Sequence, residues 1–195
     1  MQKNEQITRI GRKTYLSGGA KTYDYAFRSD IAREINDAVN DFFSPIRIVV
    51  WESIQLNNWL NLLLSKNTIF VEIQSGFEFI VFNKLMDMFG NMYTLLLNPD
   101  EEMIARYMRN ELIIAKTLFS RSPVSKNKRN IKLEKLAVDV IADKYLSGLL
   151  GASGVEDVIL GIKHNYTIDV SKMFTYAKRR NKEKELIDIW ESDND

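Results

Sequence analysis

The stretch Ile46–Gln74, IRIVVWESIQLNNWLNLLLSKNTIFVEIQ, decides the fold class because two apolar runs flank a helical pattern. The first run, residues 46–51, is nearly continuous and rich in β-branched residues, as in a strand that is covered on both faces. Ser53 is a suitable N-cap for a helix, and apolar residues follow it at helical spacing. Thr68–Ile73 again has the pattern of a buried strand. The stretch therefore predicts a βαβ unit with a right-handed crossover.

The neighbouring segments extend this α/β pattern in both directions. Alternating aromatic residues at positions 23–27 predict a half-buried strand. The other elements expected in this core are a helix capped by Ser29 or Asp30, an apolar helix from Ser75-Gly76 to Gly90, a strand at Tyr93–Leu97, a helix after Asn98-Pro99-Asp100 and a strand at Leu112–Phe119. The expected fold class is α/β, with α+β as the alternative, and a mixed or mostly parallel sheet of about four strands with flanking helices.

The C-terminal part of the chain has a different character. Residues 121–132 are basic and contain a proline, which indicates a linker, and only helical patterns follow them. The predicted organisation is a β-hairpin in residues 1–20, an α/β core in 21–120, the basic linker in 121–132 and a helical subdomain in 133–195.

The composition limits the classes of function. The 195 residues include 27 basic and 26 acidic ones, which gives a formal charge of +1 and no global attraction to nucleic acid. There is no cysteine, which excludes disulfides and thiolate metal sites and fits a reducing compartment. No signal-peptide pattern and no apolar run of membrane-spanning length is present. We expect a soluble cytoplasmic protein that does not contact a membrane.

Few residues have the pattern of a catalytic or cofactor site. His164 is the only histidine, and there is no G-x-S-x-G nucleophile motif, so we expect no Ser-His-Asp triad. Neither G-x-G-x-x-G nor a phosphate-binding P-loop occurs. The expectation is a protein that is not an enzyme and has no catalytic residue, cofactor or bound metal.

One pair of carboxylates is the exception that we weigh. Glu52 ends the first predicted strand and Glu72 ends the second, and two carboxylates at one sheet edge could bind a divalent metal. The pattern is similar to the PD-(D/E)xK nucleases, but Gln74 occupies the position of the lysine and the proline-aspartate pair is missing. The alternative is two solvated carboxylates at strand ends.

Basic residues form the candidate nucleic-acid contacts, which can also be ordinary solvated charges. They lie in the hairpin, in the linker and near the C-terminus. The candidates are Arg9, Arg12, Lys13, Arg121, Lys126, Lys128, Arg129, Lys132, Lys178, Arg179 and Arg180.

Two resemblances suggest a function. The hairpin ITRIGRKTY at residues 7–15 resembles the wing of a bacterial winged helix-turn-helix domain, although its spacing alone favours an ordinary hairpin with basic residues. If it is a wing, we expect the three helices of that domain to precede Met1 in a longer form. The segments LEKLAVDVIADK (133–144), NYTIDVSKMFTYAKRRNKEKELIDI (165–189) and LLLNPDEE (95–102) resemble AbiEi-type antitoxins of type IV toxin–antitoxin systems.

This family resemblance implies a transcriptional regulator with an antitoxin domain that acts in abortive infection, a form of phage defence. Such antitoxins bind operator DNA in their full-length form and counter a nucleotidyltransferase toxin, which they need not contact directly. Because the recognition helix is missing, the wing residues could contact only phosphate. The alternatives are a PD-(D/E)xK-like nuclease, active or degenerate, and a protein-interaction module.

Overall fold

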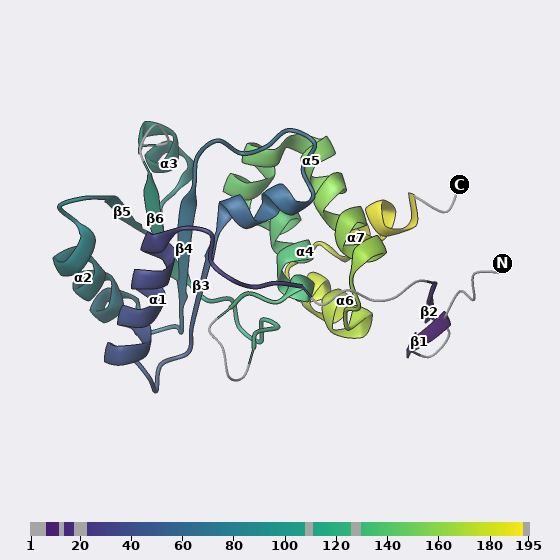
Figure 1. Ribbon diagram of the computed structural model, residues 1–195, viewed down its shortest axis with the longest axis horizontal. Coiled ribbons are helices and arrows are strands. Elements are labelled where there is room, and N and C mark those ends of the chain that lie inside the picture. The colour runs from purple at the N-terminus through teal and green to yellow at the C-terminus, as the bar shows by residue number, and fades with distance from the viewer. Residues whose placement is uncertain (1–6, 12–13, 18–22, 108–110, 126–129, 193–195) are drawn as a thin grey trace. The chain divides into compact units, whose positions relative to one another are not determined.

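The computed structural model describes residues 7–11, 14–17, 23–107, 111–125 and 130–192 (Figure 1). The chain divides into two compact units, which are described one at a time. The α/β unit comprises residues 25–132, and the helical unit comprises residues 133–195 together with residues 1–24. The α/β class and the helical C-terminal region are as the sequence predicts. The predicted hairpin and linker boundaries stay predictions.

The α/β unit is built on a mixed four-stranded sheet with the strand order β3-β4-β6-β5. β4 and β5 both pair parallel with β6, whereas β3 pairs antiparallel with β4. The strands are β3 (Ile48–Glu52), β4 (Thr68–Ile73), β5 (Thr94–Leu97) and β6 (Leu112–Thr117). The helices are α1 (Asp30–Phe42), α2 (Glu78–Phe89) and α3 (Glu101–Tyr107).

Helices α1 and α2 cover one face of this sheet, and the apolar core of the unit lies beneath them (Figure 1). The side chain of Ser29 caps α1 by accepting a hydrogen bond from Ala32 N, so this predicted cap is confirmed. Gly90 follows the last turn of α2, also as expected. The core residues that the two helices supply include Ile35, Val39, Val81, Leu85 and Phe89.

The predicted βαβ unit is wrong. β3 and β4 are antiparallel neighbours, and between them lies the 3₁₀ helix η1 (Ser53–Asn58) instead of an α-helix. The N-cap of η1 is Glu52, one residue before the expected cap, and Leu62 and Leu63 of the supposed helix are exposed. An antiparallel pair needs no crossover helix, so the apolar runs alone could not distinguish the two connections.

Asparagines explain why this connection is not an α-helix. Asn57 Oδ1 accepts from Leu64 N at 2.8 Å and its amide donates to Leu64 O at 3.1 Å. Asn67 Oδ1 accepts from Ile54 N at 3.3 Å, and the amide of Asn58 donates to Gln55 O at 2.9 Å. Side chains that bind nearby backbone groups in this way compete with helical hydrogen bonds. The helical spacing of the leucines was therefore not sufficient to form an α-helix here.

The strand predicted at residues 23–27 is also absent. The alternation itself is real, because Tyr25 and Phe27 are half-buried between exposed neighbours. However, the segment does not pair with another strand. The carbonyl of Phe27 instead accepts a hydrogen bond from a side chain, Arg33 Nη1, at 2.9 Å. Burial with a period of two therefore occurs without sheet pairing. The N-terminal hairpin does form, from β1 (Ile7–Gly11) and β2 (Thr14–Ser17).

The helical unit is organised around α4 (Leu133–Ala142), which packs against the three helices that follow it. Asp143 caps α5 by accepting from Tyr145 N and Leu146 N, and Asp169 caps α6 by accepting from Lys172 N. The remaining helices are α5 (Lys144–Asn165), α6 (Val170–Arg179) and α7 (Glu183–Glu191).

Helix α5 is long and apolar enough, by length and composition alone, to be a weak candidate for a membrane span. Gly151 interrupts it with φ 64° and ψ 176°, so it consists of two shorter helical segments. A bilayer requires about 20 continuous helical residues, which neither segment has. The fold is compatible with a soluble protein.

We predict that two glycines of α5 respond oppositely to alanine. Gly151 lies in a backbone region that is nearly restricted to glycine, so Gly151→Ala should destabilise the protein by about 1–3 kcal/mol. Gly148 is helical and exposed, and a Cβ there would meet nothing within 4 Å. Gly148→Ala should stabilise it by about 0.5–1 kcal/mol. Urea unfolding measures both changes, and equal responses would contradict a kink at Gly151.

Candidate functional site

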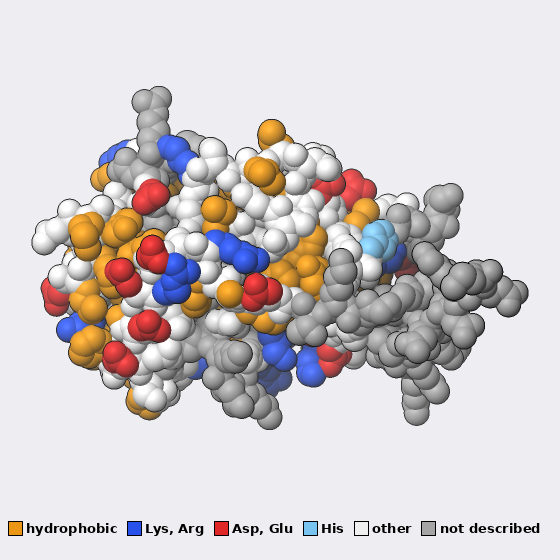
Figure 2. All heavy atoms as spheres, viewed as in Figure 1, with side chains coloured by type: hydrophobic (Ala, Val, Ile, Leu, Met, Phe, Trp, Pro, Cys, Tyr) orange, Lys and Arg blue, Asp and Glu red, His pale blue; other side chains and the backbone are white. Residues whose placement is uncertain are grey.

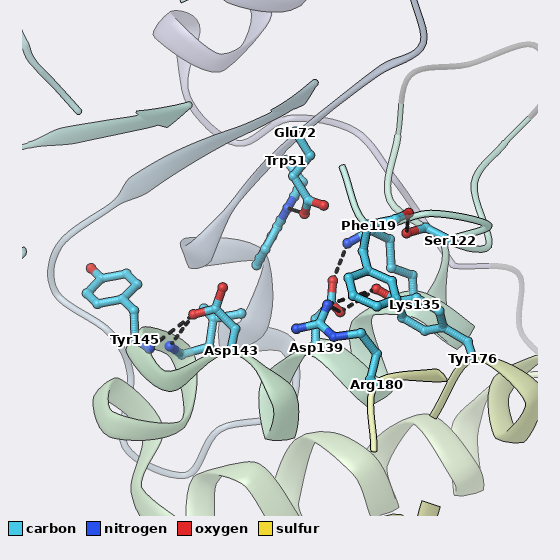
Figure 3. Close-up of polar contacts among 11 residues, drawn as sticks. Trp51, Glu72, Phe119, Ser122, Lys135, Asp139, Asp143, Tyr145, Tyr176 and Arg180 are labelled. Atoms are coloured by element: carbon cyan, nitrogen blue, oxygen red, sulfur yellow. Dashed lines mark hydrogen bonds and ion pairs between the residues drawn. The ribbon is translucent and has the colours of Figure 1, made fainter. Parts of the chain in front are cut away.

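A buried polar network surrounds the carboxylate of Asp139 in the helical unit (Figure 3). Asp139 Oδ1 accepts from the Tyr176 hydroxyl at 2.8 Å and from Arg180 Nη1 at 2.9 Å, while Oδ2 accepts from Lys135 Nζ. Arg180 Nη1 also lies 3.0 Å from the Tyr176 oxygen. Lys135 and Asp139 are buried, and the Arg180 side chain is 17% exposed. We call these four residues the Asp139 network.

Helical spacing brings the network together. Lys135 and Asp139 are four residues apart in α4, as are Tyr176 and Arg180 at the end of α6, so each pair shares one helix face. The two helices pack against each other. A second contact joins them, because Glu134 Oε1 accepts from Asp169 N at 2.9 Å. The network therefore fastens the last turn of α6 to α4.

The charges of the network define what it can do. One carboxylate faces two cations, and each of its oxygens accepts hydrogen bonds inside the unit. A carboxylate that is buried and accepts from donors of its own unit at both oxygens is not open to a substrate or a metal from solvent. Loss of Asp139 would leave a buried ammonium group without its carboxylate. The arrangement is that of a structural centre.

The predicted nucleic-acid residues fall into different environments. Lys178 and Arg179 are exposed at the end of α6, whereas Arg180 turns inward to Asp139. Arg121 is exposed, Lys132 is partly exposed and Arg9 lies in β1. The remaining candidates, Arg12, Lys13, Lys126, Lys128 and Arg129, lie outside the described residues.

Glu52 is the buried carboxylate of the α/β unit that corresponds to Asp139 in the helical unit. Its Oε1 accepts from the backbone N–H groups of Arg28 and Ser29, the latter at 3.2 Å. Its Oε2 accepts from Ser29 Oγ and from Asn67 Nδ2, both at 2.6 Å. Four donors fill the lone-pair positions of a fully buried carboxylate. Glu52 therefore holds the start of α1 and the β3–β4 connection to the end of β3.

The proposed pairing of Glu52 with Glu72 is wrong, because antiparallel strands end at opposite edges. Glu52 lies opposite Ile69 and Glu72 opposite Val49, about 10 Å apart along the strands. They also face opposite sides: Glu52 alternates with core residues beneath α1 and α2, and Glu72 does not. Both are buried, so the alternative of solvated carboxylates is wrong too.

Glu72 has local partners of its own. The indole N–H of Trp51 donates to Glu72 Oε1 at 2.9 Å (Figure 3), and Trp51 stacks on Phe70 with ring centroids 4.2 Å apart. Lys116 lies beside Glu72 in the β4–β6 register. Gln74 is exposed and accepts from Arg47 N at 3.2 Å. In the described part of the chain, no three His, Asp or Glu side chains group in a way that could hold a metal.

A cavity of about 230 Å³ lies beside Glu52 in the α/β unit. Ser29 and Asn67, which bind Glu52, form part of its wall, and Arg28, Tyr93 and Glu111 add polar groups. Isoleucines and Leu112 form the apolar part. The carboxylate of Glu52 therefore acts on this cavity only through the residues that it holds in place.

Two surface contacts shift the pKa of a charged group. The Thr117 hydroxyl donates to Glu78 at 2.7 Å, which lowers the pKa of Glu78 and joins α2 to the end of β6. A lowered pKa means that this contact stabilises the fold at neutral pH and is lost on acidification. Asp169 raises the pKa of Lys172 through a hydrogen bond at the start of α6. Both contacts support helix ends.

Sequence reasoning missed the Asp139 network, although a signal was present. Lys135 and Asp139 stand four residues apart within a helix whose other residues, apart from Glu134, are all apolar. Opposite charges at this spacing inside an apolar helix indicate a buried pair. The partners on α6 gave no such signal, because their tyrosine and arginine resemble an ordinary half-exposed helix end.

We predict that the two residues of the buried ion pair contribute unequally to the free energy of unfolding. Lys135→Met should cost only about 1 kcal/mol of unfolding free energy, because Asp139 keeps Tyr176 and Arg180 as partners. Asp139→Leu should cost about 3–5 kcal/mol, because it removes the carboxylate that pairs with the buried ammonium group of Lys135. Lys172→Met, at an exposed ion pair, is the control and should change stability by less than about 1 kcal/mol. Equal losses for Lys135→Met and Asp139→Leu in urea unfolding would contradict this account.

We also predict that Glu52 is a structural group and binds no metal. Glu52→Gln turns an amide N–H₂ toward hydrogen-bond donors and should cost about 1–3 kcal/mol of unfolding free energy. Millimolar Mg²⁺ should leave the melting temperature of the wild type unchanged, since no lone pair is free. A Mg²⁺-dependent rise in melting temperature that Glu52→Gln abolishes would contradict this assignment.

Comparisons with known proteins give a family and no function. No curated protein and no solved structure matches the chain significantly. One family model matches it over residues 1–195, which is its whole length. The chain therefore belongs to the family described as "Family of unknown function (DUF6577)".

Proposed function

We propose that this chain is a regulatory protein of the AbiEi antitoxin type, and that it is not an enzyme. In this proposal it acts in the cytoplasm of a bacterial cell and counters a nucleotidyltransferase toxin as part of a phage-defence system. The full-length form of the protein binds operator DNA. The second partner is the toxin, which the protein can counter without binding it directly.

The Asp139 network carries this proposal. Lys135 and Asp139 belong to the segment 133–144, and Tyr176 and Arg180 belong to the segment 165–189. These are two of the three segments that resemble AbiEi-type proteins. Residues that resemble one family in two distant segments also contact one another, which supports a shared helical architecture as the source of the resemblance. Because those contacts are structural, the resemblance extends to the scaffold and implies no chemistry.

The exposed cations next to the network are the proposed nucleic-acid contacts. Arg180 holds the end of α6 against α4, and Lys178 and Arg179 directly precede it in the last turn and are exposed. Cations on a fixed helix end can contact phosphates without reading sequence. The rival nuclease interpretation loses its main support, because Glu52 and Glu72 do not share a sheet edge.

Co-expression tests the proposed function. The gene next to this one should encode a nucleotidyltransferase that stops growth when it is expressed alone. Expression of this chain with it should restore growth, and an empty vector should not. A neighbour of another kind, or a growth arrest that the wild-type chain does not relieve, would contradict the proposal.

Two double variants at exposed positions test whether Lys178 and Arg179 contact DNA. In the full-length form, Lys178→Gln/Arg179→Gln should weaken repression of the operon's own promoter in a reporter assay, because it removes two phosphate contacts. Lys66→Gln/Lys184→Gln removes the same charge at other exposed positions and serves as the control. Both should melt within about 2 °C of the wild type, since exposed charges contribute little to stability. Equal repression by the two variants would remove Lys178 and Arg179 from DNA binding.

A further inference from the structure

Helix α2 has an apolar surface on its outer side that the α/β unit does not cover. Its inner face is made by Val81, Leu85 and Phe89. Phe79 and Ile80 on the outer side are 75% and 58% exposed, and Phe42 at the end of the neighbouring α1 is 54% exposed. Lys84 joins the two helices, because its ammonium group lies 4.1 Å from the centroid of the Phe42 ring. A helix that is apolar on both sides normally has a partner on both sides.

An acidic stripe runs along the exposed face of α1 beside this surface. Asp30, Glu34, Asp37 and Asp41 follow each other at intervals of four, three and four residues, so they lie on one side of the helix. Together, α1 and α2 carry six acidic and two basic residues. Figure 2 shows acidic side chains along the course of α1 with hydrophobic ones next to them over α2. Arg33 adds little positive charge here, because it pairs with Asp30.

We propose that this surface of α1 and α2 docks a basic amphipathic segment of another protein, most simply a helix. The apolar side of such a segment would cover Phe42, Phe79 and Ile80, and its lysines or arginines would pair with Glu34, Asp37 and Asp41. The same acidic stripe disfavours other occupants. It repels the phosphates of nucleic acid and anionic lipid, and two copies of this chain would bring acidic stripes together.

A designed peptide tests this proposal with purified protein. The probe is a fluorescent helical peptide with leucines on one face and lysines on the other, and its control carries glutamates in place of the lysines. Fluorescence anisotropy should show saturable binding of the lysine peptide and none of the glutamate peptide. Salt should weaken the binding, because charge pairs contribute to it.

Matched variants locate the binding surface. Phe79→Ser/Ile80→Ser should weaken peptide binding by about tenfold or more, because buried apolar anchors dominate such interfaces. Leu62→Ser/Leu63→Ser, on an exposed loop of the same unit, should leave it unchanged. Glu34→Gln/Asp37→Asn/Asp41→Asn should reduce the salt dependence. Circular dichroism and melting temperature report whether each variant keeps the fold.

Three outcomes would overturn the proposal. The first is that the lysine peptide does not bind the wild type. The second is that the Phe79/Ile80 and Leu62/Leu63 variants bind equally, which would indicate attraction to charge alone. The third is sedimentation that shows a wild-type dimer which Phe79→Ser/Ile80→Ser dissociates, because a second copy would then be the occupant.

Discussion

The helical unit depends on one buried carboxylate. Asp139 accepts hydrogen bonds from Lys135 in its own helix and from Tyr176 and Arg180 at the end of α6, and little of this network reaches solvent. Because the network is buried, removal of its anion leaves cationic groups that water cannot solvate, and the whole network is destabilised. The packing of α4 against α6, and hence the position of the exposed cations after Tyr176, depends on this one group.

Glu52 has the same function in the α/β unit. It joins three segments that are distant in sequence: the start of α1, the end of β3 and the asparagine that precedes β4. In both units, a buried acidic residue that could be mistaken for a catalytic group accepts hydrogen bonds at both oxygens from donors of its own unit. The chain therefore uses its buried acids to build the fold, and its exposed charges and apolar side chains remain available to partners.

Most of the fold could be predicted from the sequence, but the connection that mattered most for the site could not. Apolar periodicity and caps located α1, α2 and the strands β4–β6, and they indicated that the C-terminal part is helical. The prediction of an α-helix between β3 and β4 was wrong because asparagine side chains, and not the leucine spacing, determine the backbone of this connection. That one error reversed a strand and placed Glu52 and Glu72 at a common edge. Of the Asp139 network, Lys135 and Asp139 carried a readable signal, whereas Tyr176 and Arg180 required tertiary packing.

A double-mutant cycle on Tyr176→Phe and Arg180→Met tests the central claim most directly. Both side chains bind the same oxygen of Asp139 and each other, so their effects on unfolding free energy should not add. The account predicts a coupling energy of about 0.5–3 kcal/mol in urea unfolding. Additive effects, with a coupling near zero, would mean that the two residues act independently and that Asp139 does not organise the helical unit.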